Sequence, residues 1–147
     1  MNPDSLRDRS TAASAVYGLL NPIPFGFFVA ALVFDVVYAR GGELMWDKSA
    51  AWLIAIGLVV AIVPRLINLV QVWITQRRRT LLAEKLDFWL NLLAIAAAIV
   101  NSFVHSRDAY AVVPAGLWLS ACTVILLSIG NLLVSVRRAT AGSRVHA

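Results

Sequence analysis

"PAGLWLSACTVILLSIGNLLVSV", residues 114–136, runs without a single charged side chain. As an α-helix it is about 35 Å long at ~1.5 Å per residue, which exceeds the roughly 30 Å of a bilayer's hydrocarbon core. Such a segment crosses a membrane as a helix, because lipid offers no partner for exposed backbone groups. Three further apolar segments lie at 23–39, 50–74 and 86–104. The sequence therefore predicts an all-α integral membrane protein with four transmembrane helices.

The composition of the chain also fits a membrane protein better than a soluble one. Of its 147 residues, 60% are hydrophobic and 14% are charged, whereas soluble domains average about 45–50% apolar and about 25% charged residues. A single soluble core of this size could not bury so much apolar surface. The formal net charge is +5, but no basic stripe interleaved with aromatic residues is present, so nucleic acid is not an expected partner.

The distribution of Lys and Arg predicts the orientation of the helices. Of the 13 such residues, nine lie in the two tails or in the loop after the second segment, and three lie in the other two loops. Because positively charged loops stay on the cytoplasmic side, both termini are expected in the cytoplasm. The nine are Arg7, Arg9, Arg77, Arg78, Arg79, Lys85, Arg137, Arg138 and Arg144, and the three are Arg40, Lys48 and Arg107.

The short loops predict how the helices are arranged. Consecutive helices joined by short loops are usually antiparallel neighbours, so we expect a four-helix, up-down antiparallel bundle. One transmembrane domain is predicted at 16–137. It lies between two cytoplasmic tails, at 1–15 and 138–147, that are polar and expected to be mobile.

Polar side chains on these helices repeat at the helical period and therefore share faces. Polar and small residues on one face of a membrane helix indicate contact with other helices rather than with lipid. When each helix is centred in the bilayer, depth divides the polar residues into two groups. The predicted inner polar cluster comprises Arg65, Asn68, Gln71, Asp87, Asn91 and Asn131, and the predicted outer polar cluster comprises Asp35, Asn101, Ser102, His105 and Ser120.

Two interpretations remain open for each cluster. Arg65 can extend toward Asp87 and lock the register of two helices, or it can form a site for an anion, a lipid headgroup or a quinone. Asp35 can brace the outer end of the bundle as a hydrogen-bonded acid, or it can carry a proton or a cation. Locking of the bundle is the leading interpretation of the two clusters together.

The sequence lacks the patterns that enzymes and metalloproteins use. It contains no nucleophile–base pair, no glycine-rich phosphate loop and no spacing of metal ligands. Its two histidines are His105 and His146, so one bundle offers at most one imidazole to a haem, and two are needed when both axial ligands are histidine. We therefore predict a protein that is not an enzyme and that holds no cofactor and no metal.

Four stretches of the chain resemble a bacterial family of four-helix membrane proteins, domain of unknown function 2231. They are "NPIPFGFFVAALVFD", "AAWLIAIGLV", "LDFWLNLLA" and "NSFVHSR", within residues 20–107. Asp35, Asn91 and Arg107 match the pattern of that family, whereas Asn21 and Asp87 replace two of its histidines, so a metal or haem role does not carry over. The resemblance implies a multi-pass protein of the bacterial inner membrane and, for some members, a suspected association with periplasmic dehydrogenases.

These observations lead to three functional hypotheses. The leading one is a non-enzymatic accessory or assembly subunit whose polar clusters lock the helix bundle. The second is a small proton- or ion-coupled transporter that uses Asp35, and the third is a quinone-linked redox-partner module of a periplasmic dehydrogenase with a pocket near Arg65. Expected partners are the lipid bilayer, a second copy of the chain or another membrane subunit, and anionic lipid at Arg77, Arg78 and Arg79.

Overall fold

Four long α-helices make up most of the chain that the computed structural model describes, which comprises residues 19, 22–70, 82–107 and 111–143. They are α2 (Pro22–Gly41), α3 (Leu44–Val70), α4 (Leu82–His105) and α5 (Ala115–Ser143). At residues 63, 65, 67–70, 82–85 and 137–143 the backbone alone is described. Because these ranges contain helices and no strand, the predicted all-α fold is confirmed.

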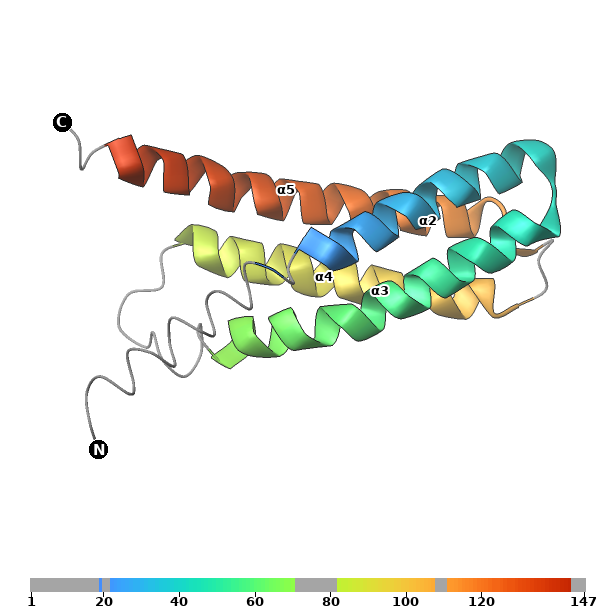
Figure 1. The fold of residues 1–147 in the computed structure, drawn as a ribbon, viewed down its shortest axis with the longest axis horizontal. Coiled ribbons are helices and arrows are strands. Elements are labelled where there is room, and N and C mark those ends of the chain that lie inside the picture. The colour runs from blue at the N-terminus through green and yellow to red at the C-terminus, as the bar shows by residue number, and fades with distance from the viewer. Residues whose placement is uncertain (1–18, 20–21, 71–81, 108–110, 144–147) are drawn as a thin grey trace.

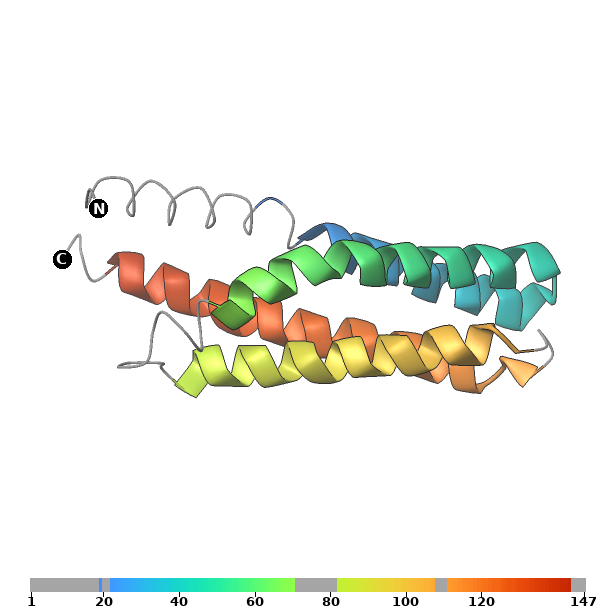
Figure 2. The same cartoon turned by 90° about the horizontal axis from the view of Figure 1, so that it is seen from below.

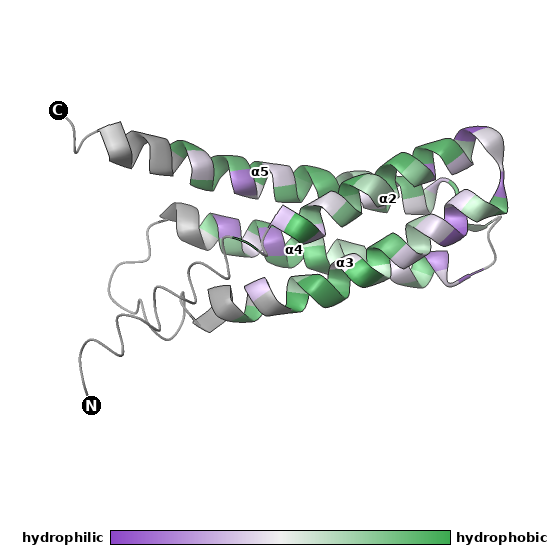
Figure 3. Cartoon of the chain, viewed as in Figure 1, coloured by the Kyte–Doolittle hydropathy of each residue, from purple (hydrophilic) through white to green (hydrophobic). Residues whose placement is uncertain are grey.

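All four helices are long and apolar enough to cross a membrane. The stretches that meet this condition are Pro22–Gly41, Leu44–Ile62, Leu86–His105 and Ala115–Val136. Large apolar side chains cover the outside of the bundle, and Trp52, Phe103 and Trp118 are each about 70% exposed. Figure 3 shows that apolar residues predominate along the length of the helices. The exposed apolar surface suits lipid rather than water, which confirms the predicted class of four-span membrane protein.

The helices run up and down in two layers, each of which is a helical hairpin (Figures 1 and 2). One hairpin consists of α2 and α3, and the other consists of α4 and α5. In addition α2 packs on α5 and α3 packs on α4, so the four helices form a closed square of neighbours. The connections within the two hairpins lie at the same end of the molecule, which we call the loop end.

Buried residues recur on each helix at alternating intervals of three and four positions. This spacing is typical of helices that pack at about +20° with their side chains interdigitated. It brings every buried polar residue onto the seam between helices. The buried positions are 24, 28, 31, 35 and 38 on α2, 47, 50, 54, 57, 61 and 64 on α3, 87, 91, 94, 98, 101 and 105 on α4, and 116, 120, 123, 127 and 130 on α5.

The middle of the bundle is an apolar layer. It is formed by Phe28 and Ala31 of α2, Ile54 of α3, Ala94 and Ala98 of α4, and Leu127 of α5. Small residues let the helices approach, as at Gly57, where a Cβ would lie 3.1 Å from the Phe28 ring. Since lipid tails are as apolar as these side chains, close van der Waals packing rather than the hydrophobic effect holds this layer together.

The ends of the helices differ from the predicted segments in two places. At the loop end, Gly42 has a φ of 71° and donates its N–H to the Tyr38 carbonyl at 2.8 Å, which ends α2. After this short turn α3 begins at Leu44, ahead of the predicted segment at 50–74, because a helix continues through polar residues that hydropathy alone does not count. At the other end α5 continues to Ser143, so residues 138–143 are helical where a mobile tail was predicted.

Candidate functional site: a buried Asp–His network

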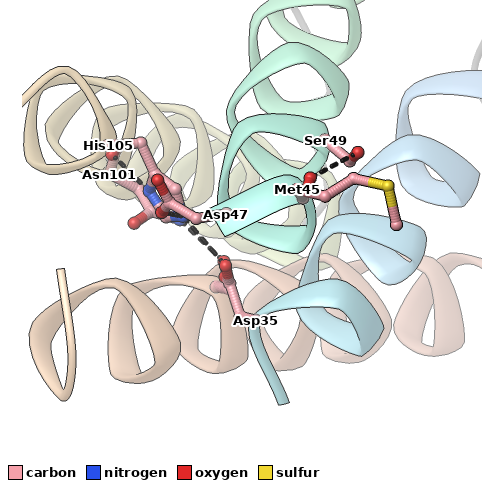
Figure 4. A network of polar contacts seen from close by, with 7 residues as sticks. Asp35, Met45, Asp47, Ser49, Asn101 and His105 are labelled. Atoms are coloured by element: carbon pink, nitrogen blue, oxygen red, sulfur yellow. Dashed lines mark hydrogen bonds and ion pairs between the residues drawn. The ribbon is translucent and has the colours of Figure 1, made fainter. Parts of the chain in front are cut away.

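Polar side chains from all four helices meet near the loop end of the bundle. Figure 4 shows those that come from α2, α3 and α4. Asp47 lies in the first turn of α3 and His105 in the last turn of α4. We use the name Asp–His network for Asp35, Asp47, Asn101, His105 and Ser120. All five are buried, with exposed fractions between 1 and 7%. Each occupies a seam position, so the helical packing itself brings them together.

A chain of hydrogen bonds in this network links α2, α4 and α5. Asn101 Nδ2 donates to Ser120 Oγ at 2.7 Å, and Ser120 Oγ donates in turn to Asp35 Oδ2. The other carboxyl oxygen, Asp35 Oδ1, lies 2.8 Å from His105 Nε2. His105 Nδ1 lies 3.0 Å from the backbone carbonyl oxygen of Asn101, one turn earlier in α4. The chain of hydrogen bonds therefore begins and ends at the same residue.

The partners of His105 determine where its hydrogens lie. A backbone carbonyl can only accept, so Nδ1 carries a hydrogen that it donates to Asn101. Nε2 faces the Asp35 carboxyl group at 2.8 Å and donates to it when the imidazole is protonated at this nitrogen.

Asp47 places a second acid beside this pair. Its Oδ1 lies 3.9 Å from His105 Nε2, which is too far for a hydrogen bond. The neighbouring Trp46 packs on Phe34 with ring centroids 5.1 Å apart, which holds the start of α3 against α2. Asp47 Oδ1 is buried and has no hydrogen-bond partner among the described residues.

The close approach of α5 to α4 confines the imidazole. A Cβ at Gly116 would lie 2.9 Å from His105 Cε1 and 2.6 Å from Val112 Cγ1. A larger residue at this position would collide with the ring, so the absence of a side chain lets His105 lie directly against α5. The imidazole is thus held between the Asp35 carboxyl group and the backbone of a neighbouring helix.

A second polar group lies on α4 toward the opposite end of the bundle. Asn91 Nδ2 donates to the Asp87 backbone oxygen at 2.8 Å and to Asp87 Oδ1 at 2.7 Å. Both residues are buried, and Gly130 of α5 packs so closely that a Cβ there would lie 2.9 Å from Asp87 Oδ1. Ten positions of α4 separate Asn91 from Asn101, about 15 Å at ~1.5 Å per residue. The apolar layer fills this interval.

The structure brings together four of the five residues predicted for the outer polar cluster. Asp35, Asn101, His105 and Ser120 are joined by hydrogen bonds, whereas Ser102 is half-buried and takes no part in the described network. Sequence reasoning missed Asp47. An acid in the first turn of a helix is usually explained by the helix dipole, so its only distinguishing signal was its position three residues before Ala50, on the buried face of α3.

The predicted inner polar cluster is described only in part. Asp87 and Asn91 are bonded to each other, but Asn131 is half-buried, and its neighbour Gly130 is the residue that packs against Asp87. The helical period explains this, because position 130 is in phase with the other buried positions of α5. The side chains of Arg65 and Asn68 and the whole of Gln71 lie outside the described residues. The contact between Arg65 and Asp87 thus stays a prediction.

A comparison with models of known protein families shows to which family the chain is related. Residues 15–137 match the family described as "Predicted membrane protein (DUF2231)". The chain belongs to this family. The match confirms the resemblance seen in the sequence motifs and extends it from residue 107 through most of α5. No curated protein and no solved structure matches the chain significantly.

Proposed function

We propose that this member of the DUF2231 family is a non-enzymatic accessory or assembly subunit of the bacterial inner membrane, whose Asp–His network locks the helix bundle. The observation that carries the proposal is the chain of hydrogen bonds that begins and ends at Asn101 and joins three helices. Hydrogen bonds between membrane helices average only about 0.6 kcal/mol, but an unpaired buried polar group costs about 1–3 kcal/mol. The network therefore disfavours every other register of α2 against α4 and α5.

The order of the hydrogen bonds supports a structural role rather than catalysis. Ser, His and Asp are also the residues of a hydrolase triad, in which the imidazole accepts the serine proton and the acid holds the other ring nitrogen. Here Ser120 donates to Asp35 instead of His105, and the Asn101 carbonyl and the Asp35 carboxyl group occupy the two nitrogens. No ring nitrogen is left to activate the hydroxyl group.

The apolar layer supports a lock over a coupled transporter. A transporter that used Asp35 would have to pass its proton or ion to the other side of the membrane. Toward the middle of the bundle the network is followed by Ala31, Ala98 and Ile54, which offer no polar group. The nearby Thr123 donates its hydroxyl hydrogen to the Leu119 carbonyl of its own helix.

The proposed orientation follows from the distribution of Lys and Arg and places both termini in the cytoplasm. The loop end and the Asp–His network then face the periplasm. The basic residues Arg77, Arg78 and Arg79 would meet the anionic lipids of the cytoplasmic leaflet. The quinone hypothesis depends on the side chain of Arg65 and would gain support from a dehydrogenase gene next to the gene for this chain.

The lock is tested by replacing Asp35 with two residues of similar size. In Asp35→Asn the amide oxygen can still accept from Ser120, and the amide nitrogen can donate to Nε2 of a neutral His105, so we expect stability within about 1 kcal/mol of the wild type. Asp35→Leu leaves Ser120 and His105 without their partner and should cost about 2–4 kcal/mol. Unfolding in mixed detergent micelles measures both. Equal stability of the two variants would contradict the lock.

Function in the cell separates the lock from the transporter. Asp35→Asn cannot alternate between a charged and a neutral form, so a transporter that relies on this acid would lose all activity. For a lock, we expect Asp35→Asn at the wild-type protein level to complement a deletion strain. Native mass spectrometry after purification in mild detergent then tests the accessory role, for which we expect a bound membrane subunit or a second copy of the chain.

A further inference from the structure

Asp47 is a buried acid, and one of its two carboxyl oxygens lacks a hydrogen-bond partner among the described residues. Its exposed fraction is 4%, and the oxygen concerned is Oδ1. Asn101 Oδ1, in the same network, is likewise buried and unpartnered. The network thus contains more buried acceptors than donors. An ionised carboxylate in such a place is strongly unfavourable unless a donor or a positive charge reaches it.

Among the described residues, the buried ionisable side chains of the network are two acids, Asp35 and Asp47, and one base, His105. Asp35 of α2 and His105 of α4 act on its carboxyl group from inside the bundle, and the exposed Lys48 acts on it from the surface. Among the described residues of α5, the uncharged Ser120 is the one that bonds to the network. When His105 is an imidazolium and both acids are ionised, the three buried side chains carry a net charge of −1.

A proton suits this position better than a metal ion does. Among the residues that the structure describes, no group of three or more His, Cys, Asp and Glu is arranged to hold a metal. Both nitrogens of His105 are already engaged, Nδ1 with the Asn101 carbonyl and Nε2 with Asp35. A proton added to Asp47, in contrast, converts an acceptor into the donor that the network lacks.

We infer that the Asp–His network is a proton-binding site that takes up one proton at Asp47 from the water at the loop end. The proton comes from a hydronium ion, which leaves as water, and a new O–H bond forms on the Asp47 carboxylate while no electrons are exchanged. The net charge of the three side chains changes from −1 to 0. This inference goes beyond the lock, because a lock requires no exchange with water.

The position of Asp47 makes the exchange one-sided. The residue lies in the first turn of α3, next to the exposed residues Glu43, Leu44 and Met45 of the loop end, and Figure 4 shows its side chain pointing toward His105. On the opposite side of the network the apolar layer separates it from Asp87 and Asn91. A proton can therefore enter and leave at the loop end without crossing the bundle.

Infrared difference spectroscopy of the purified protein tests proton uptake at Asp47. Acidification should produce the C=O band of one buried carboxylic acid in the wild type, and Asp47→Asn should abolish that band. Glu43→Gln is the matched control, because it removes an exposed carboxylate at the same end of the molecule. We expect the band to persist in Glu43→Gln. The same buried-acid band in Asp47→Asn would overturn the inference.

Nitrogen-15 NMR of histidine gives a second readout. In a His146→Gln background His105 is the sole histidine of the chain. Neutralising Asp47, 3.9 Å from Nε2, removes a negative charge beside the imidazole and should move the Nε2 signal, while Nδ1 stays protonated. In Asp47→Asn the Nε2 signal should already be shifted before acidification and should not move further when acid is added. An Nε2 signal that responds to acid identically in wild type and Asp47→Asn would contradict the inference.

A third experiment tests whether the proton enters from the loop end. It leaves the residues of the Asp–His network unchanged, so it does not depend on the folding of an Asp47 variant. In proteoliposomes, the fraction of molecules that gain the acid band after an external pH step should equal the fraction labelled from outside at Glu43→Cys. A response that matches the unlabelled fraction would show entry from the other end and would overturn the inference. The lock can fail in the Asp35 variants while proton uptake at Asp47 still holds, so the two results are distinguishable.

Discussion

Gly116 is the residue at which the smallest change should disturb the Asp–His network most. Its missing side chain leaves the space that the His105 ring and Val112 occupy, at 2.9 and 2.6 Å from where a Cβ would stand. The imidazole cannot move freely, because it is bonded on both sides. The contact therefore couples the packing of α4 against α5 to the position of a buried titratable group.

We expect Gly116→Ala to destabilise the protein by about 1–3 kcal/mol, the usual cost of overpacking. Gly26→Ala is the matched control, since nothing lies within 4 Å of a Cβ there, and it should be neutral or stabilising by up to about 1 kcal/mol. Detergent-induced unfolding compares the stability of the two variants. The nitrogen-15 signals of His105 should move in Gly116→Ala and not in Gly26→Ala. Equal stability of the two variants would show that α5 does not confine the imidazole.

The sequence predicts which residues of the network share a level but not how they bond. Helical periodicity and depth place a side chain to within about one turn, or roughly 5.4 Å. That is sufficient to group Asp35 with Asn101, His105 and Ser120. A hydrogen bond requires a placement within about 3 Å and a choice of rotamer, and these depend on how three helices pack. The order of donors, and the membership of Asp47, could therefore be found only in the structure.

At the scale of the helices, the alternation of three and four positions decides which face is buried. The apolar segments are evident from composition, because the mean hydropathy of each span is high. The ends of the helices are not evident, since the chain remains helical where it leaves the hydrocarbon. Leu44–Val70 and Ala115–Ser143 both extend into sequence that hydropathy assigns to loops or tails.

The end of α2 gives a prediction at this scale. Gly42 adopts a φ of 71°, and its N–H caps the Tyr38 carbonyl, so Gly42→Ala should cost about 1–2 kcal/mol, the penalty of a left-handed conformation for a residue with a Cβ. Gly41→Ala, one position earlier and inside the helix, meets no atom within 4 Å and should be tolerated. Gly42→Asn should recover part of the loss, because Asn accepts this conformation. Unfolding measurements in which Gly41→Ala is the more damaging change would refute this account of the turn.

At the scale of the whole molecule, the distribution of polarity is inverted relative to a soluble protein. Aspartates, asparagines and a histidine are buried, whereas Trp52 and Trp118 are exposed. The buried polar residues occupy two levels with the apolar layer between them. An arrangement of this kind lets the two ends of the bundle meet different compartments without a polar connection between them. The orientation in the membrane then decides which compartment exchanges protons with Asp47.

Cysteine labelling determines that orientation. In a Cys122→Ala background, a membrane-impermeant maleimide should reach Glu43→Cys in intact cells, because Glu43 is exposed at the loop end and the loops there carry few Lys and Arg. Ser143→Cys lies where α5 ends, at the opposite side. It should be labelled only after the cells are permeabilised. Labelling of Ser143→Cys in intact cells, with Glu43→Cys protected, would reverse the orientation. Asp47 would then exchange its proton with the cytoplasm and not with the outer compartment.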